Sequence, residues 1–409
     1  MHKKPDTKAD IITLEDRGES ISSMEPLLIR DSAQARGELA DLTVELASRS
    51  AGLRRSLPDG VHQALCELIR SMNCYYSNLI EGHNTHPIDI ERAMNGDYST
   101  DTKKRDLQLE ARAHITTQRW IDQGGLTGRA ARSEGILELH KRFCELLPDD
   151  LLWVENPESG ERIKVIPGAF RERDVSVGHH IAISPGALPR FMDRFESAYD
   201  ALGTVDAVIA SACAHHRLLW LHPFLDGNGR VARLMSYSLL RDTLDTGGIW
   251  SIARGLARNE STYKSLLAAC DQPRHGDRDG RGNLSEKALA NFAHFFLETC
   301  VDQIGFMEDL IQPKRLRDRI LIWVEEEIRA GFLPPKSGSV LQAVLYRGEL
   351  PRGELAELLG TGERNARRVT SALLDRGVLV SASSRAPLHL AFPARLAHRW
   401  MPGLFPEKV

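Results

Sequence analysis

The sequence lacks the features that would place the chain in a membrane or in the secretory pathway. No stretch approaches about 18 uninterrupted apolar residues, the length that a membrane span needs. Residues 1–6 are polar and contain no apolar signal core. We therefore expect a cytoplasmic protein with no membrane partner.

The net charge of the chain is also small. The 53 lysines and arginines nearly balance the 56 aspartates and glutamates, which leaves a formal net charge of −3 at pH 7. Such a balance gives no overall attraction to nucleic acid or to an anionic membrane surface. No internal repeat is present, which argues against a repeat array.

Cysteine is sparse and shows no metal-binding spacing. The six cysteines are dispersed, and none belongs to a Cys-x-x-Cys pair. Most fall inside helical patterns, which favours free buried thiols in a reducing cytoplasm. They are Cys66, Cys74, Cys144, Cys213, Cys270 and Cys300.

The remaining composition is that of a globular, mainly α protein. The chain has 409 residues, of which 42% are hydrophobic and 27% charged, and this length fits two or three domains. Apolar residues recur at helical spacings of three and four in residues 61–80, 104–122 and 230–242. These stretches predict three of the helices.

One stretch of twelve residues carries most of the chemistry. Residues 222–233 read His-Pro-Phe-Leu-Asp-Gly-Asn-Gly-Arg-Val-Ala-Arg. Gly227, Asn228 and Gly229 predict a tight turn at the start of a helix, where free amides and the helix dipole favour phosphate. Arg230 and Arg233 lie three residues apart, so one helical face can present both to phosphate oxygens.

The same stretch supplies an acid and a base. Asp226 is a hard oxygen ligand suited to Mg²⁺ that bridges phosphates. His222 titrates near neutral pH and is the candidate general base. Pro223 should end the preceding helix. From these residues alone we expect metal-assisted nucleotide chemistry.

A second segment, Ser77-Asn78-Leu79-Ile80-Glu81-Gly82, ends the helix predicted over residues 61–80. Gly82 suits a helix C-terminus. Glu81 lies at the negative end of the helix dipole, where an anion is mildly disfavoured. Some group outside the helix should therefore hold this carboxylate.

The C-terminal part, from about residue 335, has a different pattern. Residues 352–359 and 363–376 predict two helices around a glycine turn, and residues 378–380 and 388–390 predict two short strands. This order resembles a winged helix. Arg364, Arg367 and Arg368 would face outward from the second helix, which leaves DNA binding open as a role.

Residues 222–233 match the Fic family signature His-x-Phe-x-(Asp/Glu)-Gly-Asn-Gly-Arg-x-x-Arg at every fixed position. Ser77, Glu81 and Gly82 match the family's inhibitory pattern (Ser/Thr)-x-x-x-Glu-(Gly/Asn). The resemblance extends over roughly residues 112–300. It implies a helical Fic-fold core with a β-hairpin flap, and an enzyme that transfers AMP from ATP to a Ser, Thr or Tyr hydroxyl of a target protein.

The resemblance also implies roles for single residues. His222 would deprotonate the target hydroxyl, Asp226 would hold Mg²⁺, and Arg230 and Arg233 would neutralise the β- and γ-phosphates. The turn at residues 227–229 would form the anion hole. Glu81 would pair with Arg233 and so restrain ATP in an unproductive pose. The resemblance further places Tyr263 near the adenine and a target-binding flap at Val175, Ser176, Val177 and Gly178.

Three regions follow from these expectations. Residues 1–110 form an N-terminal helical region with the inhibitory helix, residues 111–305 the Fic core, and residues 315–409 the winged-helix-like domain. ATP and a target protein are the expected partners, and a homodimer is left open. The alternatives are a Fic-fold transferase of another nucleotide or of phosphate, and a DNA-binding regulator or toxin-type protein.

Overall fold

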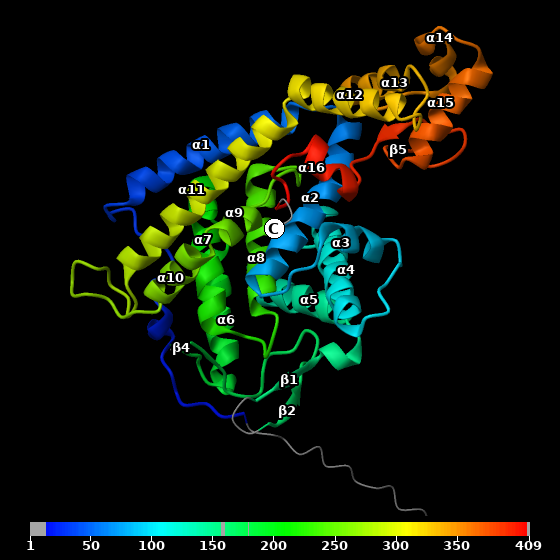
Figure 1. The fold of residues 1–409 in the computed structure, drawn as a ribbon. Helices are drawn as coiled ribbons and strands as arrows, with labels where there is room; N and C mark the ends of the chain where they lie inside the picture. Colours follow the sequence, from blue (N-terminus) through cyan, green and yellow to red (C-terminus); the bar gives the residue numbers. More distant parts are fainter. Residues whose placement is uncertain (1–13, 157–159, 179, 407–409) are drawn as a thin grey trace, which may run out of the picture.

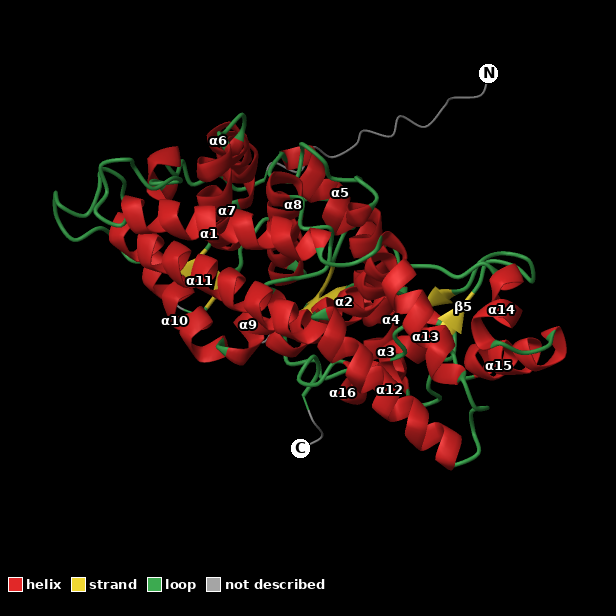
Figure 2. Ribbon diagram, turned by 90° about the horizontal axis from the view of Figure 1, so that it is seen from above, coloured by secondary structure: helices red, strands yellow, loops and turns green. Residues whose placement is uncertain are grey.

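The computed structural model describes residues 14–156, 160–178 and 180–406, and almost all of its regular structure is helical (Figures 1 and 2). Three two-stranded antiparallel sheets complete it: β1 (Trp153–Glu155) with β2 (Arg162–Lys164), β3 (Ser176–Val177) with β4 (His180–Ile181), and β5 (Leu379–Val380) with β6 (His389–Leu390). The helices are α1 (Arg36–Arg55), α2 (Asp59–Ile80), α3 (Pro87–Met94), α4 (Thr102–Asp122), α5 (Ser133–Cys144), α6 (Leu188–Tyr199), α7 (Thr204–Leu221), α8 (Asn228–Leu244), α9 (Ala253–Arg258), α10 (Glu260–Cys270), α11 (Glu286–Ile311), α12 (Pro313–Arg329), α13 (Ser337–Arg347), α14 (Leu355–Leu359), α15 (Glu363–Asp375) and α16 (Ala397–Trp400). The mainly α fold class is confirmed.

Helices α7 and α8 form the centre of the molecule and lie against each other along their length (Figure 1). Both are buried on most sides, because α1 and α11 cover α7 while α4 and α5 cover α8. The loop that joins α7 to α8, residues 222–227, contains the first half of the twelve-residue motif, and the second half forms the start of α8. The motif is therefore fixed at both ends by the two most buried helices of this region.

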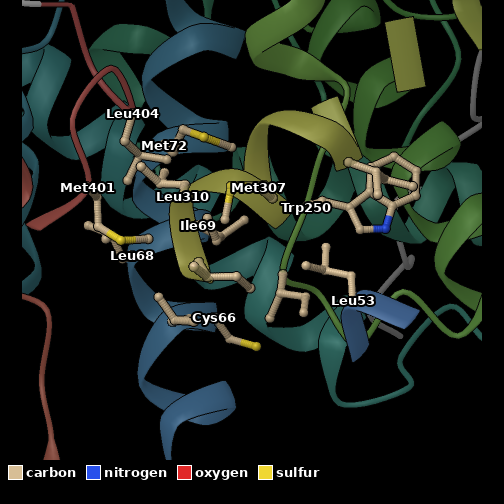
Figure 3. Close-up of a cluster of buried hydrophobic side chains, with 14 of the residues drawn as sticks. Leu53, Cys66, Leu68, Ile69, Met72, Trp250, Met307, Leu310, Met401 and Leu404 are labelled. Atoms are coloured by element: carbon tan, nitrogen blue, oxygen red, sulfur yellow. The ribbon is translucent and has the colours of Figure 1, made fainter. Parts of the chain in front are cut away.

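Helix α2 follows the pattern that the sequence predicts. Its apolar positions Leu65, Ile69, Met72 and Tyr76 are all buried. Figure 3 shows why so many faces of this helix are covered. Side chains of α2 meet α11 on one side and the C-terminal segment, with Met401 and Leu404, on another.

The C-terminal helices α12 to α15 extend away from the other helices at one end of the molecule (Figure 1). Helices α14 and α15 and the pair β5–β6 stand where the sequence predicts two helices and two strands. Helix α13 was not predicted, although its residues Val340, Leu341, Val344 and Leu345 have helical spacing and are buried. A β-bridge between Leu350 and Leu388 connects the segment between α13 and α14 to the β5–β6 hairpin.

One continuous hydrophobic core runs through all three predicted regions, from Ile29 to Leu404. The boundaries at residues 110 and 305–315 thus stay predictions, because buried side chains cross them. All six cysteines are buried free thiols, as expected. Among the described helices, none has the length and apolar character that a bilayer crossing requires.

Candidate functional site

The motif loop is held by backbone conformations at its two ends. His222 directly follows α7 and lies in the left-handed region, with φ 47°, and Gly227 directly precedes α8 with φ 82°. Within the loop, the Asn228 side chain accepts from the Phe224 amide at 3.0 Å and donates to the Phe224 carbonyl at 2.8 Å. The side chain of Asn228 therefore braces the loop, and the turn's backbone amides remain the groups that a phosphate could reach.

His222 is partly buried beside the motif turn. Its Nδ1 lies 3.4 Å from the carbonyl oxygen of Leu219, an arrangement that places the proton on Nδ1 and leaves Nε2 as a free base. Burial lowers the pKa of His222 to about 4. The imidazole is therefore neutral, and ready to accept a proton, at physiological pH.

A buried arginine that the sequence analysis did not select holds this histidine in place. Arg171 is 2% exposed, and its guanidinium donates to the carbonyls of His222 at 2.8 Å, Arg173 at 2.9 Å and Ile183 at 2.5 Å. Burial lowers its pKa to about 10, which still leaves it charged. Its acceptors are backbone carbonyls, which every residue carries, so they leave no pattern in the sequence. The role of Arg171 is therefore visible only in the three-dimensional structure.

The carboxylate of Glu81 occupies the first turn of α8. Its Oε1 lies 2.5 Å from Nη2 of Arg233. A β-carbon on Gly229 would come within 2.3 Å of the same oxygen, so only glycine leaves room for the carboxylate there. An anionic side chain thus lies against the first turn of α8, beside the helix end that should attract a phosphate.

Ser77 completes this contact. Nε of Arg233 donates to the Ser77 hydroxyl at 2.8 Å, and Nη2 donates to the Ser77 carbonyl at 3.1 Å. Burial disfavours the charge on Glu81, but the charge and hydrogen bond of Arg233 outweigh it, so the pKa of Glu81 lies below its usual value. The structure thus brings together Ser77, Glu81 and Arg233, across 152 to 156 positions of sequence.

Arg230 pairs with a different carboxylate, that of Glu110. Its Nη2 lies 3.3 Å from Oε2 of Glu110 on α4 and 3.3 Å from Nδ1 of His83, and its guanidinium stands 5.3 Å from the centre of the Phe143 ring. The side chain of Arg230 is 7% exposed. Glu110 and His83 were not identified from the sequence.

Asp226 lies exposed at the turn. Mg²⁺ in nucleotide sites is often held by one or two carboxylates, phosphate oxygens of the substrate and water. No group of three or more His, Cys, Asp or Glu that could hold a metal occurs among the described residues. The residues present fit a metal ion that enters with a nucleotide. Asp226 would be its protein ligand, and phosphate oxygens and water would supply the other ligands.

The predicted flap is a short antiparallel hairpin in which Ser176 pairs with Ile181 and Val177 with His180. Gly178 has φ 59°, and His179 lies outside the described residues. The hairpin is tied to the end of α7, because His180 Nε2 lies 2.7 Å from the Trp220 carbonyl. Val175 continues the ladder, since its carbonyl accepts from the Ala182 amide at 3.1 Å.

Tyr263 lies in the core close to Arg233. Only 2% of it is exposed, and its hydroxyl is 2.7 Å from Nε2 of His215, whose Nδ1 in turn is 2.9 Å from the Ser236 hydroxyl. Burial raises the pKa of Tyr263 to about 12. Its expected place beside an adenine stays a prediction, and the observed contacts give it a packing role.

The sequence of the chain is similar to those of known proteins. The profile of the Fic/DOC family matches residues 130–240. The chain is 29% identical over 216 residues to the protein adenylyltransferase Fic of Drosophila erecta. The matched segment covers 50% of this chain and 41% of that protein. It is also 29% identical over 218 residues to the protein of the same name from Drosophila willistoni, covering 50% of this chain and 40% of the relative. The chain thus spans less than half the length of these relatives.

A solved structure supports the fold. A Fic family protein from Desulfovibrio desulfuricans superposes with a TM-score of 0.53 at 16% identity, covering 89% of this chain and 98% of that one. The matched profile encloses both the motif loop and the flap. Residues 130–240 of the chain thus match the Fic/DOC family, and its fold resembles that of a Fic family protein.

Proposed function

We propose that the chain is a protein adenylyltransferase, which moves AMP from ATP to a hydroxyl group of a target protein. The names of the relatives in Drosophila support this activity. The observation that carries it for this chain is the contact of Glu81 with Arg233 against the first turn of α8. Such a contact is expected where the natural occupant is a polyphosphate.

In this proposal His222 takes the proton of the target Ser, Thr or Tyr hydroxyl. The hydroxyl oxygen bonds to the α-phosphorus, the bond from that phosphorus to the bridging oxygen breaks, and pyrophosphate leaves. The amides at residues 227–229 and the guanidinium groups of Arg230 and Arg233 bind the phosphates. Reactions of this kind depend on positioning and charge neutralisation more than on covalent help from the protein.

Mg²⁺, held by Asp226 and the substrate, would neutralise phosphate charge when bound. The β3–β4 hairpin, which contains the predicted flap residues 175–178, offers the target an exposed strand, since Val177 is 49% and Ile181 72% exposed. Strand addition binds backbone, so it positions the target hydroxyl with little demand on the target's side chains.

Radiolabelled ATP tests the proposal against the other group transfers. Incubating the Glu81→Gly chain with Mg²⁺ and ATP labelled at the α-phosphate should place label on the protein, and ATP labelled at the γ-phosphate should not. Label from the γ-phosphate alone would show phosphate transfer. A stronger signal from UTP or another α-labelled nucleotide would reassign the donor.

DNA binding by the C-terminal region is the second candidate function. The supporting observation is that Arg364, Arg367 and Arg368 all lie exposed on α15, next to the β5–β6 hairpin. Arg367 is paired with Glu363 at 2.8 Å, whereas no such carboxylate contact is described for its two neighbours. Exposed arginines on a helix are the usual means of contacting DNA phosphates.

Replacing Arg364, Arg367 and Arg368 together by alanine should weaken binding to a duplex DNA in a fluorescence anisotropy titration. Each lost phosphate contact should reduce the slope of log affinity against log salt by about 0.9. The matched control replaces three exposed arginines elsewhere, Arg55, Arg278 and Arg281. Equal losses in both triple variants, or no DNA binding by the parent, would exclude a specific role for α15.

A further inference from the structure

The side chain of Glu110 is shared between two cationic groups at the edge of the phosphate site. Its Oε2 lies 2.7 Å from Nδ1 of His83 and 3.3 Å from Nη2 of Arg230. His83 Nδ1 and Arg230 Nη2 are 3.3 Å apart, so the three atoms form a closed triangle. The shorter contact goes to His83, and the longer one goes to the arginine that the proposed function assigns to a β-phosphate.

Each of the two motif arginines is paired with one glutamate. Glu81 neutralises Arg233, and Glu110 partly neutralises Arg230. Glu110 is 11% exposed and comes from the middle of α4, so it cannot swing away as a helix end can. His83 stands two residues beyond Glu81, on the segment that leaves the inhibitory helix. One segment thus contacts both arginines, one directly and one through a shared carboxylate.

We propose that Glu110 and His83 set how tightly the site holds a β-phosphate, with Glu110 as a fixed counter-charge that competes for Arg230 and His83 as the group that offsets it. The inference rests on the proposed nucleotide site. It assigns to two residues outside the family motif an effect on one phosphate of the ligand.

Opposite directions follow for the two residues. Without the charge of Glu110, the guanidinium of Arg230 is free to pair with phosphate, so binding of a β-phosphate strengthens. Without His83, Glu110 has only Arg230 as a partner, and binding of a β-phosphate weakens. A side chain that merely supported the fold would weaken binding when either residue is changed.

The charged groups around His83 fix the expected pH dependence. It faces Glu110 from α4, Arg230 from α8 and Glu81 from the end of α2. The hydrogen bond that His83 donates to the Glu110 carboxylate raises the pKa of His83 above its usual value. Protonation of His83 adds a positive charge and occupies Glu110, so a β-phosphate should bind more tightly as the pH falls.

The test is the affinity of the full chain for ADP and for AMP, measured by calorimetry with Mg²⁺ present. Both probes lack a γ-phosphate, so the contact between Glu81 and Arg233 can stay in place. Glu110→Gln should bind ADP about tenfold more tightly, the size of effect expected for removing one partly buried charge beside a phosphate. His83→Gln should bind ADP about threefold more weakly and should lose the pH dependence that the parent shows beyond that of ADP itself. AMP should bind all variants equally.

The matched control is Asp106→Asn, which removes one negative charge from α4 one turn away from Glu110, without a described contact to Arg230. It should leave both affinities unchanged, and thermal melts should show that every variant is folded. ADP bound equally by all variants, or more weakly by Glu110→Gln, would overturn the inference and leave AMP transfer standing. A chain that binds neither AMP nor ADP in any variant would overturn the nucleotide site itself, and the inference with it.

Discussion

Replacing Glu81 by glycine is expected to raise AMP transfer about a hundredfold, because it frees Arg233 for the γ-phosphate. A single well-placed cationic or hydrogen-bonding group at a site of developing charge is worth about 10²–10³ in rate. In the parent chain that group is already neutralised at 2.5 Å, and the carboxylate also fills the space above Gly229. Removing Glu81 therefore restores both the charge and the space. Auto-modification with α-labelled ATP at saturating nucleotide and Mg²⁺ measures the effect.

Two further variants separate charge from space in this experiment. Glu81→Gln keeps the volume and can still accept from Arg233 but has no charge, so an intermediate rate is expected. Glu67→Gln removes a carboxylate from the same helix, where it contacts Arg70 and Arg119 instead of Arg233, and should leave the rate unchanged. The inhibitory role of Glu81 would be wrong if the glycine variant were no more active than the parent.

The parts of the fold and site that the sequence could predict are those with local patterns. Helix α2 was predictable because its apolar residues repeat at three and four, and the start of α8 because a glycine pair brackets Asn228. The contact between Glu81 and Arg233 was different. It joins residues 152 positions apart, and only the family resemblance indicated it.

The remaining site residues could not be predicted, since their partners lie far away in the sequence and form no pattern. Arg171 is held by three carbonyl oxygens, and a carbonyl leaves no trace in a sequence. Glu110 is a buried acid in an ordinary amphipathic helix until its contact with Arg230 is seen. The packing of Met401 and Leu404 near α2 could not be predicted for the same reason. Apolar contacts between residues far apart in the chain leave no local sequence pattern.

Replacing His222 is expected to reduce AMP transfer by about 10²–10⁴-fold, the usual contribution of a general base. The measurement is best made in the Glu81→Gly chain, where the signal is largest. The variant needs care because His222 has φ 47°, a conformation that strains alanine. Asparagine tolerates this region better, so His222→Asn removes the base and keeps the turn, while His222→Ala tests the same loss with more strain. Both should bind ATP as the parent does.

The pH profile separates a base from a structural residue. Burial holds the pKa of His222 at about 4, so the neutral imidazole predominates throughout the neutral range. The protonation of His222 should therefore leave the transfer rate level between about pH 6 and pH 8 and lower it only below about pH 5. Because acid protonates the imidazole and removes the acceptor, this fall should vanish from the residual rate of His222→Asn. Arg171 holds the carbonyl of His222 but takes no proton, so Arg171→Lys should lower the rate without moving the acid limb. If His222→Asn retained the parent's rate, the proton of the target hydroxyl would have to leave by another route, and the motif would serve binding alone.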